Sequence, residues 1–467
     1  MFIDSGKADA RLARALDTAW LREHLSQALW RTDETPGAIG EVFVRHVRES
    51  KKGVHMLYAV ELNGHTPARE QMYVGYLVRP EELDEEYKSA QKKAKIQPAH
   101  GRAVVVIPEA ALVLTAFPND RKLTLLSETQ MCAWLQEHWR KILPGKTAAA
   151  PGSISALTLT PLRYVPERRY TAHCRAWLQR ENEQPENLSF VVKQVGDEKR
   201  AKRLYRNLLS LESALAQLDQ VPFRVPRAWA WDESLAAVFL EYLPGENLKQ
   251  LLFTLDLERM MPRVGETLAV FHRAPKRVRK RVSFQSELRE NRETMRELAQ
   301  ALPQTRTRLR LLFENLQSLR WTHDRPPALL HGTYRLNHIF LHQDELVLLD
   351  LDSLRMGPPA YDIANFLTSL YYLEAQERIA LELRQQIAQA FLSGYARATP
   401  APIAPQMVLW FLASLMINKQ AGKYVGHFHE DCEEKVARML ALAEAALQTA
   451  QTLRPSLTLP ELARLLP

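Results

Sequence analysis

The chain has 467 residues, of which 46% are hydrophobic and 25% are charged. These fractions exclude global disorder, and the length predicts two or three domains. The net charge of +8 comes from 62 Lys and Arg against 54 Asp and Glu. No zinc-finger or RNA-recognition signature accompanies this charge, so we expect no nucleic-acid partner.

The three cysteines are far apart and include no Cys-x-x-Cys pair, which favours neither a disulfide framework nor a zinc site. The N-terminus lacks the apolar run of a signal peptide, and no stretch approaches 18 uncharged apolar residues. We therefore expect a cytoplasmic protein without a membrane span.

Residues 1–145 predict a small α+β domain whose role the sequence leaves open. Helical spacing of apolar residues predicts helices over 8–30, 80–95 and 127–143. Alternating apolar residues predict strands over 42–47, 54–62, 72–78, 104–107 and 111–116. The stretch 146–153 is rich in small residues and helix breakers, which predicts a linker.

The remainder of the chain predicts a β-rich part followed by a helical part. Strands are expected over 154–164, 169–179, 188–195 and 236–242, and a helix over 198–218. Mainly helical blocks over 247–320 and 362–452 enclose a strand-loop-strand segment at 329–352. The expected boundaries are 154–246 for the β-rich part, 247–453 for the helical part and 454–467 for a C-terminal tail.

The strand-loop-strand segment carries the chemistry. Its loop is His331-Gly332-Thr333-Tyr334-Arg335-Leu336-Asn337-His338, and Asp350 lies at the end of its second strand. Such a hairpin suits phosphoryl transfer, because the loop can meet an acceptor hydroxyl while the strand-end carboxylate holds Mg²⁺.

This segment resembles the H-G-D-x-x-x-x-N catalytic loop and the I-D metal motif of aminoglycoside phosphotransferase-like kinases. Downstream, Gly357-Pro358-Pro359-Ala360-Tyr361-Asp362-Ile363-Ala364 resembles the family's G-D-P-x-x-D-L-A, with Pro358 in place of the first acid. Upstream, Phe190-Val191-Val192-Lys193 resembles the third-strand lysine motif. The resemblance spans roughly 153–450. It implies an α+β, two-lobed protein-kinase-like fold, with a small β-rich N-lobe and a helical C-lobe, behind the N-terminal domain.

The resemblance also implies an ATP site. Lys193 would contact the nucleotide phosphates, and Glu212 is the candidate helix partner of this lysine, with Glu198 as a competitor. Backbone groups of the hinge would meet adenine at Glu241, Tyr242 and Leu243.

The implied metal is Mg²⁺, with Asp350 as its ligand. Asp352 is either a second ligand or a cap of the next turn. Asp362 would brace the catalytic loop and take no part in the chemistry.

The loop departs from the family at two positions. Among its catalytic-loop residues His331, Thr333 and His338, Thr333 replaces the aspartate that accepts the hydroxyl proton, and threonine can only hydrogen-bond near neutral pH. His338 replaces the Mg²⁺-binding asparagine, and neutral imidazole is a poorer Mg²⁺ ligand than oxygen. A shift in loop register would bring Asn337 to the metal instead. His338 is either a displaced base or a histidine packed behind the loop.

The expected phosphate loop also departs, because Pro166-Glu167-Arg168-Arg169 lacks the glycine that permits close approach to phosphate. A carboxylate at Glu167 would repel phosphates unless it points away. The segment 117–123 resembles one that precedes the kinase lobe in some of these proteins, where it could cap the cleft or bind a partner.

Two functional hypotheses follow. The first is a degenerate kinase, a pseudokinase or regulatory protein that binds nucleotide, a metabolite or a partner protein. The second is an active ATP-dependent kinase that phosphorylates a hydroxyl of a small molecule such as a sugar or amino sugar. The sequence leaves the acceptor open.

Overall fold

The computed structural model describes residues 10–34, 37–50, 53–63, 69–142, 153–179, 186–319, 326–399, 401–426, 431–454 and 456–467. The chain divides into two compact units. The first comprises Met1–Tyr205 and Ala228–Tyr242, and the second comprises Arg206–Arg227 and Leu243–Pro467. The expected linker lies outside the described residues except for Ser153, which begins a strand.

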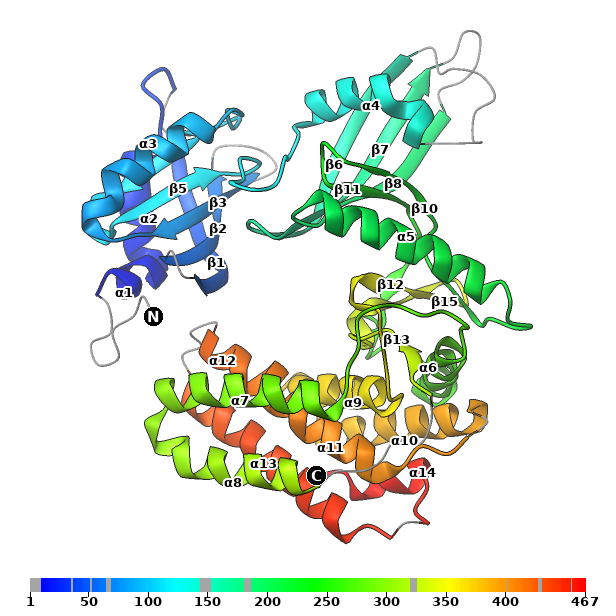
Figure 1. Cartoon of the computed structure of the whole chain (residues 1–467). Helices are drawn as coiled ribbons and strands as arrows, with labels where there is room; N and C mark the ends of the chain where they lie inside the picture. Colours follow the sequence, from blue (N-terminus) through cyan, green and yellow to red (C-terminus); the bar gives the residue numbers. More distant parts are fainter. Residues whose placement is uncertain are drawn as a thin grey trace. The chain divides into compact units, whose positions relative to one another are not determined.

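The N-terminal part of the first unit is a sheet of five antiparallel strands in the order β1-β2-β3-β5-β4 (Figure 1). The elements of this part are α1 (Ala10–Leu16), α2 (Thr18–Ala28), β1 (Ala38–Ser50), β2 (Gly53–Asn63), β3 (Arg69–Leu77), α3 (Leu83–Lys93), β4 (Val104–Ile107) and β5 (Leu112–Ala116). All five predicted strands are confirmed. The helix predicted over 8–30 is two helices, because the Asp17 side chain accepts hydrogen bonds from the backbone N–H groups of Ala19 and Trp20 and caps α2.

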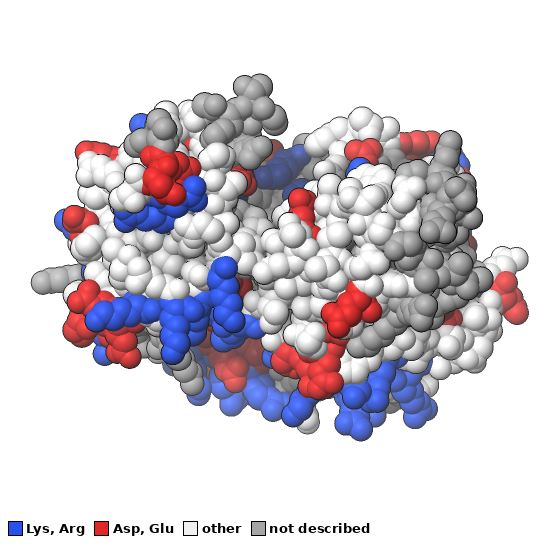
Figure 2. Space-filling model, turned by 90° about the horizontal axis from the view of Figure 1, so that it is seen from above, with Lys and Arg blue, Asp and Glu red and all other residues white. Residues whose placement is uncertain are grey.

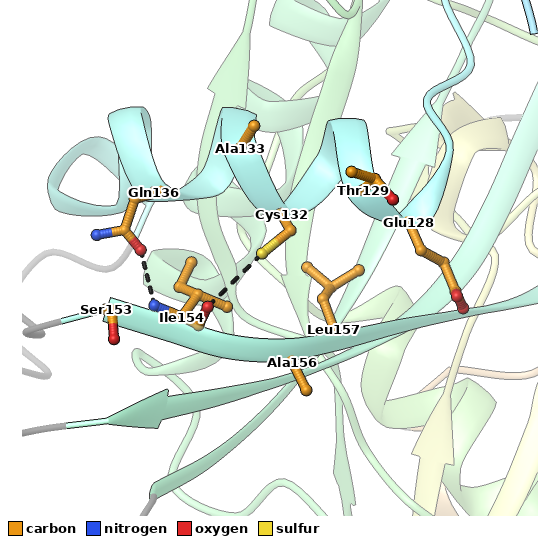
Figure 3. Close-up of a pocket in the computed structure, with 9 residues that line it drawn as sticks. All are labelled: Glu128, Thr129, Cys132, Ala133, Gln136, Ser153, Ile154, Ala156 and Leu157. Atoms are coloured by element: carbon orange, nitrogen blue, oxygen red, sulfur yellow. Dashed lines mark hydrogen bonds between the residues drawn. The ribbon is translucent and has the colours of Figure 1, made fainter.

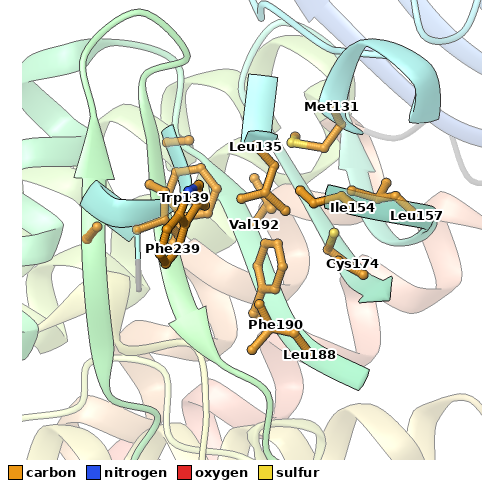
Figure 4. Packing of buried hydrophobic residues seen from close by; sticks show 14 of the residues in the cluster. Met131, Leu135, Trp139, Ile154, Leu157, Cys174, Leu188, Phe190, Val192 and Phe239 are labelled. Carbon is orange, nitrogen blue, oxygen red and sulfur yellow. The ribbon is translucent and has the colours of Figure 1, made fainter. Parts of the chain in front are cut away.

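The rest of the first unit is a second five-stranded antiparallel sheet, in the order β10-β11-β8-β7-β6. Its strands are β6 (Ser153–Val165), β7 (Arg169–Gln179), β8 (Glu186–Gln194), β10 (Ala228–Asp232) and β11 (Ala237–Glu241). Helix α4 (Glu128–Ile142) packs on one face, where Leu135 and Trp139 join Phe190 and Val192 in an apolar core (Figure 4). Helix α4 therefore packs on the β-rich lobe, although the sequence placed it in the N-terminal domain.

Strand β6 is the edge of this sheet, and α4 supplies partners to its backbone. Gln136 Oε1 accepts a hydrogen bond from the Ile154 N–H at 2.7 Å, and Glu128 Oε1 accepts one from the Leu159 N–H at 2.9 Å. Figure 3 shows the groove between the helix and the strand, in which Cys132 lies between Glu128 and Gln136. Acceptors that occupy the donors of an edge strand discourage pairing with another chain.

The second unit contains the helical lobe and the hairpin of the expected catalytic loop. Strands β12 (Glu246–Asn247), β14 (Ile339–His342), β15 (Glu345–Leu348) and β9 (Phe223–Arg224) form one sheet in that order, and β13 (Ala328–Leu330) pairs with β16 (Arg355–Gly357). The helices are α6 (Leu257–His272), α7 (Phe284–Ala301), α8 (Arg306–Ser318), α9 (Ala360–Ala375), α10 (Leu381–Ala398), α11 (Pro405–Leu415), α12 (Gly422–Gly426), α13 (Cys432–Thr452) and α14 (Leu459–Leu462). Helix α5 (Glu198–Leu215) runs from the first unit into the second. The predicted strand-loop-strand segment and its flanking helical blocks are confirmed.

The C-terminal segment is an integral part of the helical lobe. The Tyr371 hydroxyl and Arg384 Nη2 donate hydrogen bonds to the Pro467 carbonyl at 2.7 and 2.9 Å. Leu459 and Leu462 of α14 are buried. The segment predicted as a tail is therefore packed, because its leucines cover α10.

A β-rich lobe and a helical lobe behind a small α+β domain confirm the predicted fold class. No helix in the described part of the chain is long and apolar enough to cross a membrane. On the face drawn in Figure 2, groups of Lys and Arg lie beside groups of Asp and Glu.

Candidate functional site

Asp362, at the start of α9, holds the backbone of the catalytic-loop segment. Its carboxylate accepts hydrogen bonds from the His331 N–H at 2.6 Å and from the Gly332 N–H at 2.8 Å. His272 Nε2 lies 3.3 Å from the same carboxylate, and Asp362 is fully buried. Burial acts to raise the pKa of Asp362, but the hydrogen bonds and charges of its partners outweigh it and lower this pKa. The carboxylate is therefore ionised and fixes the loop.

Gly332 makes the tight turn of the loop possible. Its φ of +83° is in the left-handed region, and a Cβ at this position would lie 2.3 Å from the Ser353 carbonyl oxygen. A residue with a side chain is excluded on both grounds. The sequence pattern His-Gly thus has a steric cause here.

Thr333 follows this turn. Its Oγ1 lies 3.5 Å from His331 Nδ1, at the upper limit for a hydrogen bond. His331 Nε2 lies 3.0 Å from the Leu349 carbonyl, which can only accept, so Nε2 carries the proton and Nδ1 carries the lone pair. Burial lowers the pKa of His331. A neutral imidazole therefore faces the threonine hydroxyl. Thr333 has no carboxylate that could take the proton of a substrate hydroxyl.

His338 lies inside the loop, between Arg335 and Asp350. Its Nδ1 lies 2.9 Å from the Thr333 carbonyl, and Arg335 donates to its Nε2 from Nε at 3.1 Å and from Nη2 at 2.9 Å. Asp350 Oδ2 is 3.4 Å from the same Nε2. Burial, with help from the Arg335 charge, lowers the pKa of His338 to about 3. His338 is therefore neutral and its lone pair is engaged, so the contact with Asp350 is no ion pair and His338 does not fit a displaced base.

The residues present fit Mg²⁺ poorly. Asp350 supplies a carboxylate, but the neighbouring ligand position holds an imidazole that already accepts from Arg335. Asn337 and Asp352 are both exposed. Within the described residues no group of three or more His, Cys, Asp or Glu side chains is placed to hold a metal ion. The arrangement lacks the several oxygen ligands that Mg²⁺ requires.

Lys193 lies on the face of the β-rich sheet opposite α4. It is 9% exposed, and it alternates along β8 with Phe190 and Val192, which point into the α4 core. On the same face His173 pairs in register with Val191 and stacks on Tyr242, with ring centroids 3.7 Å apart. This face gathers the predicted phosphate lysine and one predicted hinge residue.

The other predicted nucleotide residues lie around it or in the second unit. Glu241 ends β11, and Leu243 begins the second stretch of the second unit. Glu212 also lies in the second unit, half exposed, and pairs with Arg227 at 3.4 Å. Its assignment as the partner of Lys193 stays a prediction.

The turn between β6 and β7 is held by the N-terminal domain. Asp120 Oδ2 accepts hydrogen bonds from the Glu167 N–H at 2.8 Å and from the Tyr164 hydroxyl at 2.7 Å. Lys122 Nζ lies 2.6 Å from Glu167 Oε2. The Arg168 N–H donates to the Val165 carbonyl at 3.0 Å. Glu167 has a φ of +60°. Two backbone donors of the expected phosphate loop therefore already have partners within the chain.

Sequence reasoning missed a partly buried amine beside the loop at 331–338. Lys419 lies on the π-helical turn η6 (Met416–Ala421), and its Nζ donates to Asn365 Oδ1 at 2.6 Å and to the Gly332 carbonyl at 3.4 Å. Burial, with help from the Arg355 charge, lowers the pKa of Lys419 to about 7. Burial also raises the pKa of the nearby Glu287 to about 7. No motif marks these residues, since only the fold brings η6 and α7 to the loop.

A protein-family model matches this region. Residues 175–402, a little under half of the chain, match the model of the phosphotransferase enzyme family, APH. A search of curated proteins finds no match.

Several solved structures are similar to this chain. A choline kinase from Cryptosporidium parvum is 14% identical, with 68% of this chain and 95% of that chain covered and a TM-score of 0.46. The GDP complex of an aminoglycoside 2′-phosphotransferase is 14% identical, with coverages of 70% and 99% and a TM-score of 0.44. An amicoumacin kinase in complex with AMP-PNP and Ca²⁺ is 14% identical, with coverages of 67% and 92% and a TM-score of 0.41.

The family match confirms the resemblance inferred from the motifs. The matched residues include Lys193, the loop at 331–338 and Asp362. The protein is therefore phosphotransferase-like in its β-rich and helical lobes.

Proposed function

We propose that this phosphotransferase-like protein binds ATP and transfers its γ-phosphate poorly or not at all, as a pseudokinase or regulatory protein. The observation that carries the proposal is Thr333, which stands at the position of the family's aspartate in a loop whose backbone Asp362 braces. Loss of a general base typically costs about 10²–10⁴-fold in rate. Asp362 holds the loop, which lacks a carboxylate at position 333 to accept the proton.

The β-rich lobe supports the nucleotide half of this proposal. Lys193 is a nearly buried cation on the face that also holds the His173–Tyr242 stack. In the β6–β7 turn the N–H groups of Glu167 and Arg168 already donate within the chain. Phosphate recognition would then rest on side-chain cations more than on backbone donors.

The first experiment is a thermal-shift titration with ATP, ADP and GTP on the wild type, Lys193→Ala and Lys199→Ala. Lys199 is exposed on α5 and serves as the matched control. A ligand at 100 times its Kd stabilises the native state by about 2.7 kcal/mol. We expect ATP to raise the Tm of the wild type and of Lys199→Ala but not of Lys193→Ala. A folded wild type that responds to no nucleotide contradicts the proposal.

A second experiment addresses transfer. Thr333→Asp restores a carboxylate to a loop that is already braced. ATP turnover gained by this variant, and absent from the wild type, would support a site that lacks only its base. Rapid turnover by the wild type with any acceptor would overturn the pseudokinase assignment.

The second candidate function is an active ATP-dependent kinase for a hydroxyl of a small molecule such as a sugar or amino sugar. Lys419 favours it, because an amine with a pKa of about 7 lies against the Gly332 carbonyl, next to Thr333. A neutral amine can accept the hydroxyl proton as oxygen attacks phosphorus and ADP leaves. Turnover that falls in Lys419→Met and rises in the wild type with a midpoint near pH 7 would support it.

A further inference from the structure

Two hydrogen-bond acceptors lie unusually close together at the end of β15. The Thr333 carbonyl can only accept, so Nδ1 of His338 carries the proton and Nε2 presents its lone pair. Asp350 Oδ2 lies 3.4 Å from that lone-pair nitrogen. A carboxylate oxygen and an imidazole lone pair repel each other at this separation unless a cation lies beside both.

Arg335 is the cation that contacts this nitrogen. Its Nε and Nη2 both donate to His338 Nε2, at 3.1 and 2.9 Å. The guanidinium is planar, always charged and rich in N–H donors, so it suits a site where a carboxylate and another acceptor converge. The three side chains belong to one short stretch of the second unit.

The charge of Arg335 also acts on Lys249. Burial, reinforced by the charges of Arg378 and Arg335, lowers the pKa of Lys249. A divalent cation at Asp350 would face the like charge of Arg335, and the neighbouring imidazole nitrogen already accepts from Arg335. A phosphate group would instead be attracted by the charge of the Arg335 guanidinium.

We propose that the Arg335 guanidinium takes the place of a divalent metal ion beside Asp350, so that the protein binds the phosphates of a nucleotide without Mg²⁺. The proposal rests on the nucleotide binding put forward above and changes what that binding requires. His338 is then a positioning residue, because it holds Arg335 through Nε2 and is itself oriented by the Thr333 carbonyl.

Calorimetric titration of ATP in Mg²⁺ and in EDTA tests the proposal on the full chain. We expect the Kd of the wild type to differ by less than about three-fold between the two buffers. Arg335→Gln should weaken ATP binding in EDTA by about ten-fold or more, while Arg310→Gln, an exposed arginine on α8, should not change it.

The double variant Arg335→Gln/His338→Asn supplies an oxygen ligand and removes the competing cation. We expect it to bind ATP at least ten-fold more tightly in Mg²⁺ than in EDTA, or about 1.4 kcal/mol. Electron paramagnetic resonance of Mn²⁺ without nucleotide gives a separate readout, with ion bound by the double variant and none by the wild type. Circular dichroism confirms that each variant is folded.

The possible failures are distinguishable. Wild-type ATP binding that needs Mg²⁺ and is unchanged in Arg335→Gln overturns this inference and leaves the proposed nucleotide site standing. Mn²⁺ bound by the wild type overturns it as well. A folded wild type that binds ATP in neither buffer overturns the proposed function, and this inference with it.

Discussion

The carboxylate of Asp120 accepts a hydrogen bond at 2.8 Å from the backbone N–H of Glu167, the residue at the tip of the β6–β7 turn. The other carboxylate oxygen accepts from the N–H groups of Lys122 and Leu123, both at 2.8 Å. One side chain thus orders a segment of the N-terminal domain and the turn of the β-rich lobe together. The sequence left the role of residues 117–123 open, and the hydrogen bonds of Asp120 show that this segment has a structural role.

Asp120→Ala should loosen this junction. The variant leaves the Glu167 N–H and the Tyr164 hydroxyl without their charged acceptor, and hydrogen bonds to charged groups contribute about 1.5–3 kcal/mol each. We expect the free energy of unfolding of the first unit to fall by about 2–4 kcal/mol. Urea unfolding measures this, and hydrogen exchange should quicken at residues 164–168. Glu85→Ala, an exposed acid on α3, is the control and should lie within about 0.5 kcal/mol of wild type.

Asp362→Asn should weaken the hydrogen bonds that hold the loop at 331–338 and lower the free energy of unfolding. An amide offers one acceptor oxygen where the carboxylate serves two N–H groups, and its NH₂ opposes the other donor. Breaking such a buried charged network costs about 3–5 kcal/mol. Asp219→Asn, at an exposed position, should have no such effect.

The same pair of variants gives a pH signature. The pKa of Asp362 is lowered in the folded state. Its contribution is therefore present above the unfolded pKa, about 3.9, and is lost as the pH falls through the lower folded value. The stability difference between wild type and Asp362→Asn should shrink below about pH 4. A difference that does not change with pH would contradict an ionised Asp362.

Gly332→Ala should be more damaging than Gly196→Ala. Both glycines have positive φ, +83° and +85°, but an added Cβ lies 2.3 Å from the Ser353 oxygen at Gly332 and 3.3 Å from the Arg168 oxygen at Gly196. The left-handed backbone alone costs an alanine roughly 1–2 kcal/mol. We expect about that loss at Gly196 and more than about 3 kcal/mol at Gly332, measured by thermal unfolding. Equal losses would show that the overlap relaxes freely.

Glu287 and Lys419 should make the free energy of unfolding depend on pH in opposite directions, below and above about pH 7. The pKa of Glu287 is raised from 4.5 to about 7, so between these values the folded state alone holds the proton and the contribution falls as pH rises. The pKa of Lys419 is lowered from 10.5 to about 7, so between these values only the unfolded state is protonated and the contribution rises with pH.

Variants separate the two slopes. Glu287→Gln should flatten the pH dependence of the unfolding free energy between about pH 4.5 and 7, and Lys419→Met between about pH 7 and 10.5. One proton changes the slope by at most about 1.4 kcal/mol per pH unit. Urea unfolding across pH measures this, with the exposed Glu314→Gln as control. Slopes that match wild type in both variants would show that neither pKa is shifted.

The sequence predicted much of the fold because helical and strand periodicity are local. The strand over 104–107 and the hairpin at 329–352 are confirmed, and the family match confirms the motif resemblance. The split of the first helix was missed because one capping residue, Asp17, overrides the apolar spacing. Helix α4 was assigned to the wrong neighbour because periodicity gives a helix its apolar face but does not say which sheet covers that face.

The sequence by itself determined the two-lobed fold class and the presence of a threonine at position 333 of the loop at 331–338, since these follow from residue identity and order. Only the tertiary structure decided that Lys419 contacts Gly332, 87 positions away, and that Asp120 holds Glu167, 47 positions away. It also decided that Arg335 and Asp350 meet at His338. Hydrogen bonding and burial depend on atoms from segments that are far apart in the sequence. A local sequence pattern does not predict these contacts.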